Sequence, residues 1–333
     1  MITTTIAFET YWRFAAERLA MFYRRRRDPL GPWTSDPILR LYRFTNTFRA
    51  TDRVSQYLIR EVQYGADRSE EPIEVFFRTL LFKIFNKIET WEALEAVHGP
   101  LAWRSIDLDA LDRTLTLLHS RGRSIYSAAY IIPAPPFGRD RKHSNHLALI
   151  ARMMADQLPD LLRRAPDLRT VYQRILAYPG LGPFLAFQYA IDLNYSTLLD
   201  FDESKFVVAG PGALDGISKC FSATNGRSPE AIVQWVTDRQ EIEFAKRGLD
   251  CQGLFGRPLQ PIDCQNVFCE VSKYTRVAHP ELKGVANRQR IKQKYKRVER
   301  GLDPLSFPPR WNLNCGSESD AFSVARHDQL TLL

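Results

Sequence analysis

The sequence is poor in cysteine and in long apolar runs, and both absences exclude classes of protein. Five cysteines in 333 residues are an odd number, in a chain long enough to fold without covalent cross-links. We therefore expect reduced thiols and a cytoplasmic protein rather than a disulfide-linked secreted one. No stretch approaches about 18 uninterrupted apolar residues, so we expect no membrane partner. The first residues, MITTTIAF, have no basic region ahead of an apolar run, so we expect no signal peptide.

Motifs that hold metals or nucleotides are missing as well. Cys251, Cys264 and Cys269 do not follow the paired spacing of zinc or iron–sulfur ligands, and we expect them to be buried thiols. His143 and His146 lie three residues apart without an evident third ligand. No G-x-x-x-x-G-K-[S/T] motif occurs, so the chain is not itself a P-loop kinase. The sequence predicts no metal and no cofactor.

What the chain does have is an excess of positive charge. Lysine and arginine number 46 against 38 acidic residues, which gives a net charge of +8. Such a balance favours a polyanionic partner, and nucleic acid is the commonest one. A basic protein without such a partner is an equal alternative on charge alone.

Most segments have the 3.6-residue apolar period of helices, and few alternate as strands do. We therefore predict an all-α fold with two helical lobes around a cleft. An N-terminal helix and basic linker are expected at 1–40, the main helical domain at 41–310, and a flexible tail at 311–333. The GPG at 210–212 lacks a preceding strand and predicts a tight turn instead of a dinucleotide site. Helices are predicted at 9–23, 55–64, 72–85, 91–97, 108–119, 144–158, 168–178, 184–195, 229–246 and 264–274.

The most informative stretch is YPGLGP at 178–183, between two apolar helices. Pro179 ends the first helix, and Pro183 fits the first turn of the second, where its missing N–H has no effect. Gly180 and Gly182 allow a tight reversal and leave backbone amides uncovered. Bare amides at a helix N-terminus bind phosphate oxygens well.

This arrangement resembles the helix-hairpin-helix of DNA repair glycosylases, in which a Pro-Gly-x-Gly hairpin grips the DNA backbone. The resemblance implies backbone contacts at Gly180, Leu181 and Gly182. The alternative is an ordinary connection between two helices of a bundle.

The same resemblance implies a catalytic aspartate about twenty residues beyond the second hairpin glycine. Asp202 stands at that distance and is our first choice, followed by Asp200 and then Glu203. A carboxylate there can stabilise the oxocarbenium charge on the sugar and orient water. The alternative is a carboxylate that only caps the next helix. The Schiff-base lysine of bifunctional relatives is replaced by Phe184, which implies a monofunctional enzyme that leaves an abasic site.

Five phrases resemble a narrower family. They are RFTN at 43–46, FRATDRVSQYL at 48–58, FVVAGPGALDG at 206–216, GRPL at 256–259 and IDCQNVFCE at 262–270. The family is that of the alpha-glutamyl/putrescinyl thymine pyrophosphorylases, also known as the helical domain of 5-hydroxymethyluracil DNA kinases. The resemblance extends roughly from 41 to 274.

Stand-alone bacterial members of this family include antiphage DNA glycosylases that remove glucosylated hydroxymethylcytosine, and the chain is most similar to those. The resemblance implies a monomeric enzyme that excises a modified base from double-stranded phage DNA. Two alternatives stay open: a transferase-like step in thymine hypermodification, and a non-catalytic module that only holds DNA.

Polar residues in these phrases suit a pocket for a flipped, sugar-decorated base. Arg49, Asp52, Arg53 and Gln56 have the i, i+3, i+4, i+7 spacing of one helix face. The alternative is a solvated or salt-bridged face, and Asp263 can instead cap the following helix. The complete predicted set is Asn46, Arg49, Asp52, Arg53, Gln56, Asp263, Gln265 and Asn266.

Two basic runs are candidates for phosphate contacts, although a charged run can also be a solvated face. The first is Arg24–Arg27. The second contains Arg288, Arg290, Lys292 and Lys294, followed by Lys296, Arg297 and Arg300.

Overall fold

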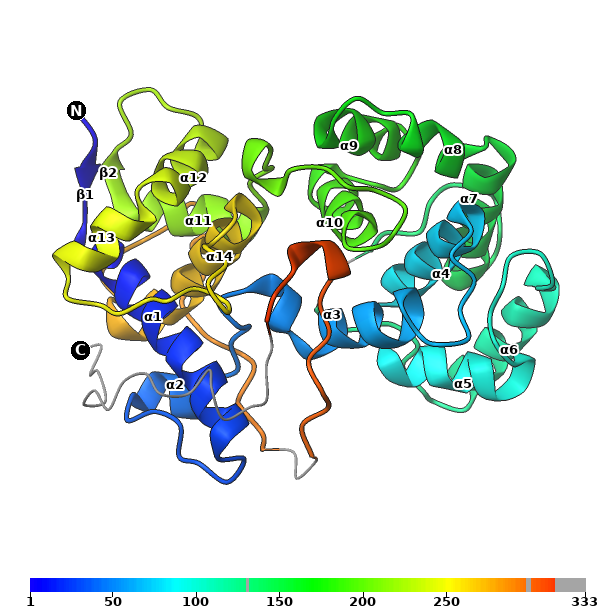
Figure 1. Cartoon of the computed structure of the whole chain (residues 1–333), viewed down its shortest axis with the longest axis horizontal. Coiled ribbons are helices and arrows are strands. Elements are labelled where there is room, and N and C mark those ends of the chain that lie inside the picture. Colours follow the sequence, from blue (N-terminus) through cyan, green and yellow to red (C-terminus); the bar gives the residue numbers. More distant parts are fainter. Residues whose placement is uncertain (130–131, 298–300, 315–333) are drawn as a thin grey trace. The chain divides into compact units, whose positions relative to one another are not determined.

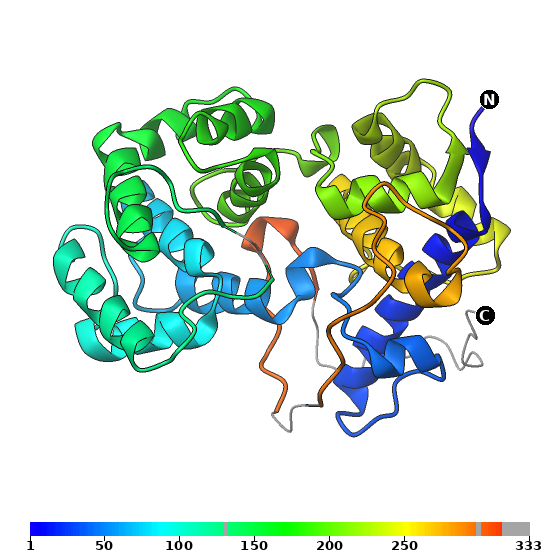
Figure 2. The same ribbon diagram turned by 180° about the vertical axis from the view of Figure 1, so that it is seen from behind.

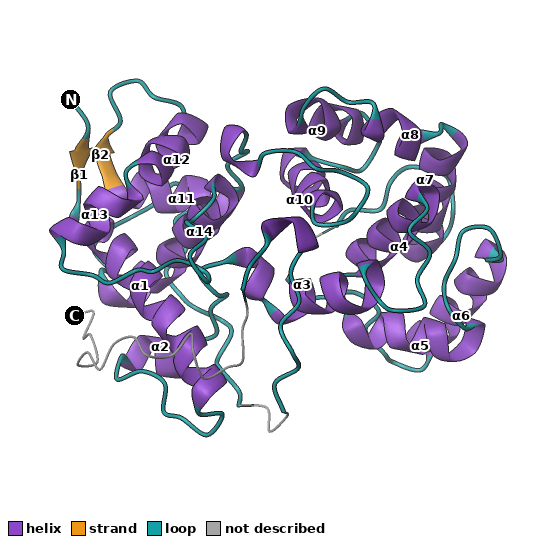
Figure 3. Ribbon diagram, in the orientation of Figure 1, coloured by secondary structure: helices purple, strands orange, loops and turns teal. Residues whose placement is uncertain are grey.

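The chain is almost entirely helical. The computed structural model describes residues 1–129, 132–297 and 301–314. Within these ranges the strands are β1 (Thr3–Thr4) and β2 (Phe221–Ala223), which pair antiparallel (Figure 3). The predicted all-α fold is confirmed. The predicted flexible tail lies for the most part at 315–333, outside the described residues, and Arg300 lies outside them too.

Internal contacts divide the chain into two compact units. Unit 1 comprises Met1–Asp52, Glu203–Leu305 and the chain from Trp311, whereas unit 2 comprises Arg53–Asp202 and Ser306–Arg310. Unit 1 is therefore assembled from segments far apart in the sequence. The division expected at residues 40 and 310 stays a prediction.

Helix α14 (Pro261–Ala278) is central to unit 1. It packs against α1 (Ile6–Arg27), α11 (Pro211–Cys220), α12 (Pro229–Asp238) and α2 (Pro37–Leu41) (Figure 1). Nearly all of the apolar side chains of α14 are buried, as expected for a helix surrounded by others. Unit 1 also contains α13 (Gln240–Lys246) and the 3-10 turns η1 (Arg49–Thr51), η3 (Glu203–Lys205) and η4 (Pro309–Trp311), the last of which begins in unit 2.

Helix α1 is positioned by its aromatic face. Thr5 caps the helix by accepting a hydrogen bond from the amide of Ala7 at 3.1 Å. Tyr11 and Trp12 are fully buried, and the Tyr11 ring lies 4.4 Å from the ring of Phe268 on α14. Large buried rings of this kind hold two helices together mainly through the area they remove from water.

The extensive packing of α11 against α14 depends on glycine. A Cβ on Gly216 would overlap the backbone of Phe268, and one on Gly212 would overlap the thiol of Cys269. The GPG at 210–212, predicted as a tight turn, is in fact the start of α11, with Gly210 as N-cap and Pro211 as the first helical residue. The two glycines of α11 are therefore four residues apart on one face, where they let the helix backbones approach.

Unit 2 is built around α4 (Pro72–Phe85), whose side chains are buried from Glu74 to Phe85. It contacts the π-helical turn η2 (Leu58–Gln63) and the helices α5 (Ile88–His98), α7 (Lys142–Ala155), α8 (Leu158–Arg163) and α10 (Pro183–Asn194). Figure 2 shows this unit from behind. Unit 2 also contains α3 (Arg53–Tyr57), α6 (Leu108–Ser120) and α9 (Leu168–Leu176).

Candidate functional site

The predicted hairpin is present between α9 and α10. Gly180 has a φ of +80°, and a Cβ there would come within 2.9 Å of the Cβ of Pro135. Both the backbone conformation and the space therefore require glycine at this position.

Gly182 has a different role. It is the N-cap of α10 with an ordinary extended backbone, φ −82° and ψ 171°, and a Cβ there would meet nothing within 4 Å. Because glycine has no side chain, the first turn of α10 receives no side-chain cap. Gly182 and Pro183 are exposed, so this positively polarised helix end faces solvent.

A cavity of about 610 Å³ opens beside this turn. The hydroxyl of Tyr178 donates to Asp156 at 3.1 Å, and Arg152 donates to the same carboxylate oxygen at 2.8 Å. Burial and the hydrogen bond to Asp156 raise the pKa of Tyr178 to about 12, which keeps its hydroxyl a donor. The lining residues are Phe137, Arg152, Asp156, Leu158, Leu161, Arg174, Ala177, Tyr178 and Pro179.

The second hairpin helix is anchored in the core of unit 2 by a buried ion pair. Lys83 on α4 lies 3.3 Å from Asp192 on α10, with side chains 3% and 0% exposed. The Lys83 ammonium also donates to Asn86 at 2.7 Å. Removing one partner of a buried pair leaves an uncompensated charge, so this pair fixes the register of α10.

The loop after α10 leads to the predicted catalytic carboxylates and is held at both ends. The side-chain amide of Asn194 donates to the carbonyl of Phe201 at 3.0 Å and accepts from its amide at 2.9 Å. Asn194 thus closes residues 195–200 into a loop whose ends are fixed to the end of α10.

Arg310 fixes the middle of the same loop. Its guanidinium donates to the carbonyls of Leu199 at 2.7 Å, Ser196 at 3.3 Å and Asn194. It also forms an ion pair of 3.0 Å with Asp200. No motif in the sequence assigns Arg310 a role; the only local signal is the two prolines before it, which indicate an ordered turn.

The three candidate carboxylates have different surroundings. Asp202 is exposed, and the Asp200 side chain is 82% exposed although it is paired with Arg310. The Glu203 side chain is only 3% exposed and lies 3.4 Å from the guanidinium of Arg257. That guanidinium stands 4.0 Å above the ring of Trp311, a distance typical of a cation–π contact. Glu203 is therefore a buried, paired group, and the two aspartates are the accessible ones.

The family-like phrases of unit 1 meet at the N-terminus of α14. Asp263 is 5% exposed and accepts hydrogen bonds from the amides of Arg49 at 2.8 Å and Gln260 at 3.0 Å. Burial raises the pKa of Asp263 to about 6, against the opposing effect of these two hydrogen bonds. Asp263 thus caps its helix, the alternative considered for it, and at the same time fixes the turn η1.

Asn46 is the hub of the loop that precedes η1. Its amide donates to Asp52 at 2.9 Å, its side chain accepts from Arg18 at 2.9 Å, and its carbonyl accepts from Asn266 at 3.0 Å. Burial raises the pKa of Asp52 to about 6. Gln265 accepts from the amide of Gly210 at 3.1 Å, which ties α14 to the start of α11.

The prediction that Arg49, Asp52, Arg53 and Gln56 share one face of a helix is wrong. The backbone of Asp52 is extended, with φ −67° and ψ 144°, so η1 ends there and α3 begins anew at Arg53. Arg53 instead pairs with Glu89 at 2.9 Å, and Gln56 donates to and accepts from the backbone of Ser306 at 2.9 Å. The helix is interrupted because the Asp52 carboxylate turns back to bind the Asn46 amide. Whether any of the predicted set binds a base stays a prediction.

The remaining candidates are placed as follows. Arg24 pairs with Glu17 at 2.9 Å, whereas residues 288–294 run along the surface of unit 1 with their cations exposed. His146 accepts from Tyr126 at 2.7 Å and donates to a backbone carbonyl, and burial lowers its pKa to about 4. Cys264 is buried, whereas Cys251 and Cys269 are partly exposed. Across the described residues, no three His, Cys, Asp or Glu side chains are grouped as metal ligands.

Comparison with known proteins decides the family. The family described as "5-hmdU DNA kinase, helical domain" matches residues 5–284, most of the chain. The chain belongs to this family. The resemblance inferred from the five phrases is thereby confirmed, and the family's matched region contains the hairpin, the carboxylate loop and all five phrases.

The chain is also similar to a curated protein, the "5-hmdU DNA kinase" of Bacillus phage SP10. It is 25% identical over 286 residues, which are 80% of this chain and 44% of the relative. The chain thus spans less than half the length of the relative that it matches. No solved structure is significantly similar to this chain. None of the helices described for this family member is both long and apolar enough to cross a bilayer.

Proposed function

We propose that the protein is a monofunctional DNA glycosylase that excises a modified base. The observation that carries the proposal is the continuous path α9, hairpin, α10, anchored loop and Asp202. The uncapped N-terminus at Gly182 supplies amides for a DNA phosphate, and the fixed loop holds an accessible carboxylate at the expected distance along the chain.

The reaction needs only a water molecule and this carboxylate. The bond between C1′ of the sugar and the base nitrogen breaks, and its electron pair leaves with the base, which takes up a proton. Positive charge develops on the sugar and is stabilised by the Asp202 carboxylate. Water then bonds to C1′ and gives its proton to the carboxylate. The carboxylate releases that proton to solvent, which replaces the proton taken up by the base, and an abasic site and a free base remain. The target nucleotide must leave the duplex stack for this to happen.

The favoured substrate is a bulky modified base in phage DNA, with glucosylated 5-hydroxymethylcytosine as first choice. The resemblance to stand-alone family members that act in antiphage defence supports it. A site that hydrogen-bonds sugar hydroxyls leaves its own polar groups unpaired when the sugar is absent. Such a site rejects the bare base by about four to five orders of magnitude, which would spare the host chromosome.

The test is to incubate the protein with plain, hydroxymethylated and glucosylated phage DNA, and to identify released bases by mass spectrometry. We expect free modified base and abasic sites from the glucosylated DNA alone, with EDTA present or absent. Equal release from unmodified host DNA, or loss of activity with EDTA and recovery with zinc, would contradict the proposal.

The family's name favours a second candidate, a transferase-like step in thymine hypermodification. The relative reported for this chain is named a 5-hmdU DNA kinase, although this chain has no P-loop motif. The same mass spectra distinguish the two, because a transferase leaves every base attached and changes the mass of a thymidine-derived nucleoside. Binding of DNA with neither outcome would identify a non-catalytic module.

A further inference from the structure

Residues 288–297 form an extended segment on unit 1, beyond the end of the family match at residue 284. The amide of Arg43 donates to the carbonyl of Gln293 at 3.0 Å, and the amide of Tyr295 donates to the carbonyl of Leu41 at 2.9 Å. Lys294 stands opposite Tyr42 in an antiparallel bridge. These hydrogen bonds hold the middle of the segment in a strand-like conformation.

Every second residue of this segment is a cation. Side chains alternate between the two faces of an extended chain, so the cations share one face at intervals of about 6.6 Å. Ile291 and Tyr295, in the other register, are partly buried, and the Tyr295 ring meets the edge of Trp33 at 6.5 Å. The cations are all exposed: Arg288, Arg290, Lys292, Lys294 and Lys296, here named the basic ladder.

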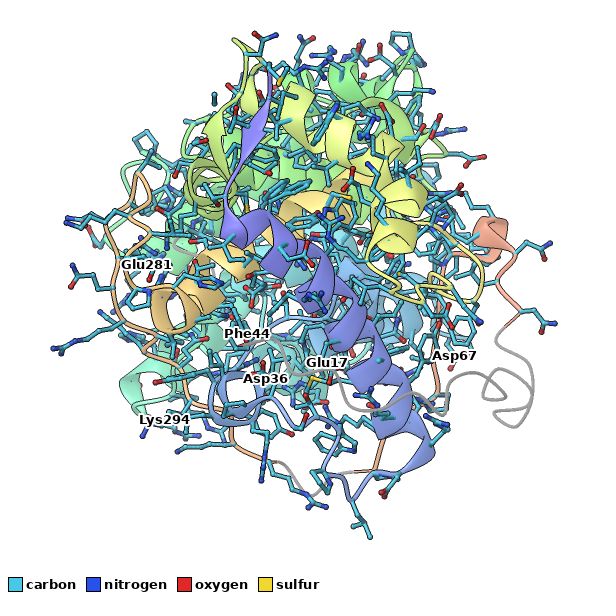
Figure 4. All side chains as sticks on the ribbon, turned by 90° about the vertical axis from the view of Figure 1, so that its left-hand side faces the viewer. Glu17, Asp36, Phe44, Asp67, Glu281 and Lys294 are labelled. Carbon is cyan, nitrogen blue, oxygen red and sulfur yellow. The ribbon has the colours of Figure 1, made fainter. Side chains whose placement is uncertain are left out.

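No carboxylate in the described residues pairs with the basic ladder. Some exposed cations elsewhere do have an acidic partner, as Arg104 has Glu71 and Arg152 has Asp156. Figure 4 shows Lys294 at the outer edge of the view, whereas the carboxylates of Glu17 and Asp36 are buried. Like charges in a row repel one another, and a polyanion laid along the row relieves that repulsion.

The ladder is also fixed in position. Arg276 on α14 donates to the carbonyl of Arg290 at 3.2 Å, and Arg297 donates to the carbonyl of Pro29 at 3.5 Å. Together with the bridge at Lys294, these contacts attach the segment near its start, middle and end. Its charges are therefore arranged in advance as a line, where an untethered basic tail would have to be ordered on binding.

We propose that the basic ladder binds the sugar–phosphate backbone of DNA without regard to base sequence or modification. A straight row of evenly spaced cations fits a linear polyanion, whose phosphates recur at a similar interval, better than it fits a compact anion. The choice of DNA over another polyanion rests on the proposed function. Binding of this kind is driven by release of counterions from the phosphates, so its strength depends steeply on salt.

The test measures the salt dependence of binding to a fluorescein-labelled duplex of unmodified DNA by fluorescence anisotropy. The double variant Lys292→Gln with Lys294→Gln removes two ladder charges. The control, Arg121→Gln with Arg123→Gln, removes two exposed cations of unit 2 that lie outside any ion pair of the described chain. The plot of log K against log salt has a negative slope, and each lost phosphate contact makes that slope less steep by about 0.9. Two lost contacts therefore make it less steep by about 1.8.

Between about 50 and 200 mM salt, the factor by which DNA affinity falls should be about twelvefold smaller for the ladder variant than for the wild type. The control should match the wild type. An unchanged slope in the ladder variant, or an equal change in both variants, overturns the proposal. So does wild-type protein that binds phosphatidylserine vesicles but not DNA. The assay contains no excisable base, so a protein that excises nothing still gives a clear result on the ladder.

Discussion

The guanidinium of Arg310 lies 3.0 Å from the carboxylate of Asp200 and donates to Leu199, which is 111 positions earlier in the chain. The loop that leads to Asp202 is therefore fixed from outside its own stretch of sequence. Since the loop lies between the end of α10 and the candidate carboxylates, its rigidity determines how well those carboxylates are positioned.

Replacing Arg310 with alanine should lower excision at least tenfold and lower the free energy of unfolding by about 1–3 kcal/mol, because three carbonyls lose their donor. Hydrogen exchange at residues 195–201 should quicken. Arg104→Ala, which removes an exposed ion pair with Glu71, is the control and should leave both the excision rate and the free energy of unfolding unchanged. Normal excision by a folded Arg310→Ala protein would show that the loop needs no such anchor.

Substitution of the carboxylates should separate catalysis from structure. Asp202→Asn should lower the rate of excision by at least about 100-fold while DNA affinity and melting temperature stay near the wild type, because shape is kept and only charge is lost. Glu203→Gln should instead lower the melting temperature, since Arg257 loses its buried partner. An active Asp202→Asn beside an inactive Asp200→Asn would move the catalytic role by two residues.

The two hairpin glycines should respond differently. Gly182→Val should fold normally, because a Cβ there has open space, yet it should weaken binding to every DNA sequence by covering the α10 amides. Gly180→Ala should cost about 1–3 kcal/mol of stability through its positive φ and its contact with Pro135. DNA titration and thermal melting of both variants decide this. Full binding by Gly182→Val would leave the hairpin as an ordinary helix connection.

Much of the helical framework could be predicted from local pattern. The predicted helix at 72–85 matches α4 residue for residue, and the turn at Gly180 was predicted because proline and glycine act on their own backbone, whereas Gly182 has an ordinary extended backbone. The predicted helix at 229–246 is divided at Arg239 into α12 and α13. The 3.6-residue apolar period in the sequence does not reveal such a break.

The candidate site was harder to predict because it depends on contacts that the apolar pattern does not report, one between residues six positions apart and others between distant segments. Whether Asp52 continues a helix depends on the Asn46 amide, and the position of Asp263 depends on Arg49, 214 residues away. Arg310 was missed for the same reason. The glycine spacing in α11 was available in the sequence, but its meaning requires knowing that α14 packs there.

Stability should depend on pH through Asp52. Burial raises the pKa of its carboxyl to about 6 from an ordinary value near 3.8, so the folded protein holds this proton more tightly than the unfolded chain. The stabilisation is complete below about pH 4 and is lost as pH rises through about 6, with an upper limit of about 3 kcal/mol. Asp52→Asn keeps an acceptor for Asn46, so its stability relative to the wild type should increase between pH 4.5 and 7. Denaturant titrations across that pH range measure the free energy of unfolding of both proteins. If the two free energies change with pH in parallel, the prediction is contradicted.

The division of unit 1 between the two ends of the sequence determines the order in which the protein can fold as it is synthesised. Unit 2 is continuous from Arg53 to Asp202 apart from Ser306–Arg310, so most of it has emerged from the ribosome before α14 exists. Helix α1, in contrast, must wait for a partner 253 positions later, the separation between Tyr11 and the Cys264 carbonyl that it binds. Throughout that interval the rings of Tyr11 and Trp12 lack their partners Phe268 and Phe244, and a nascent chain at this stage exposes apolar surface that a chaperone can cover.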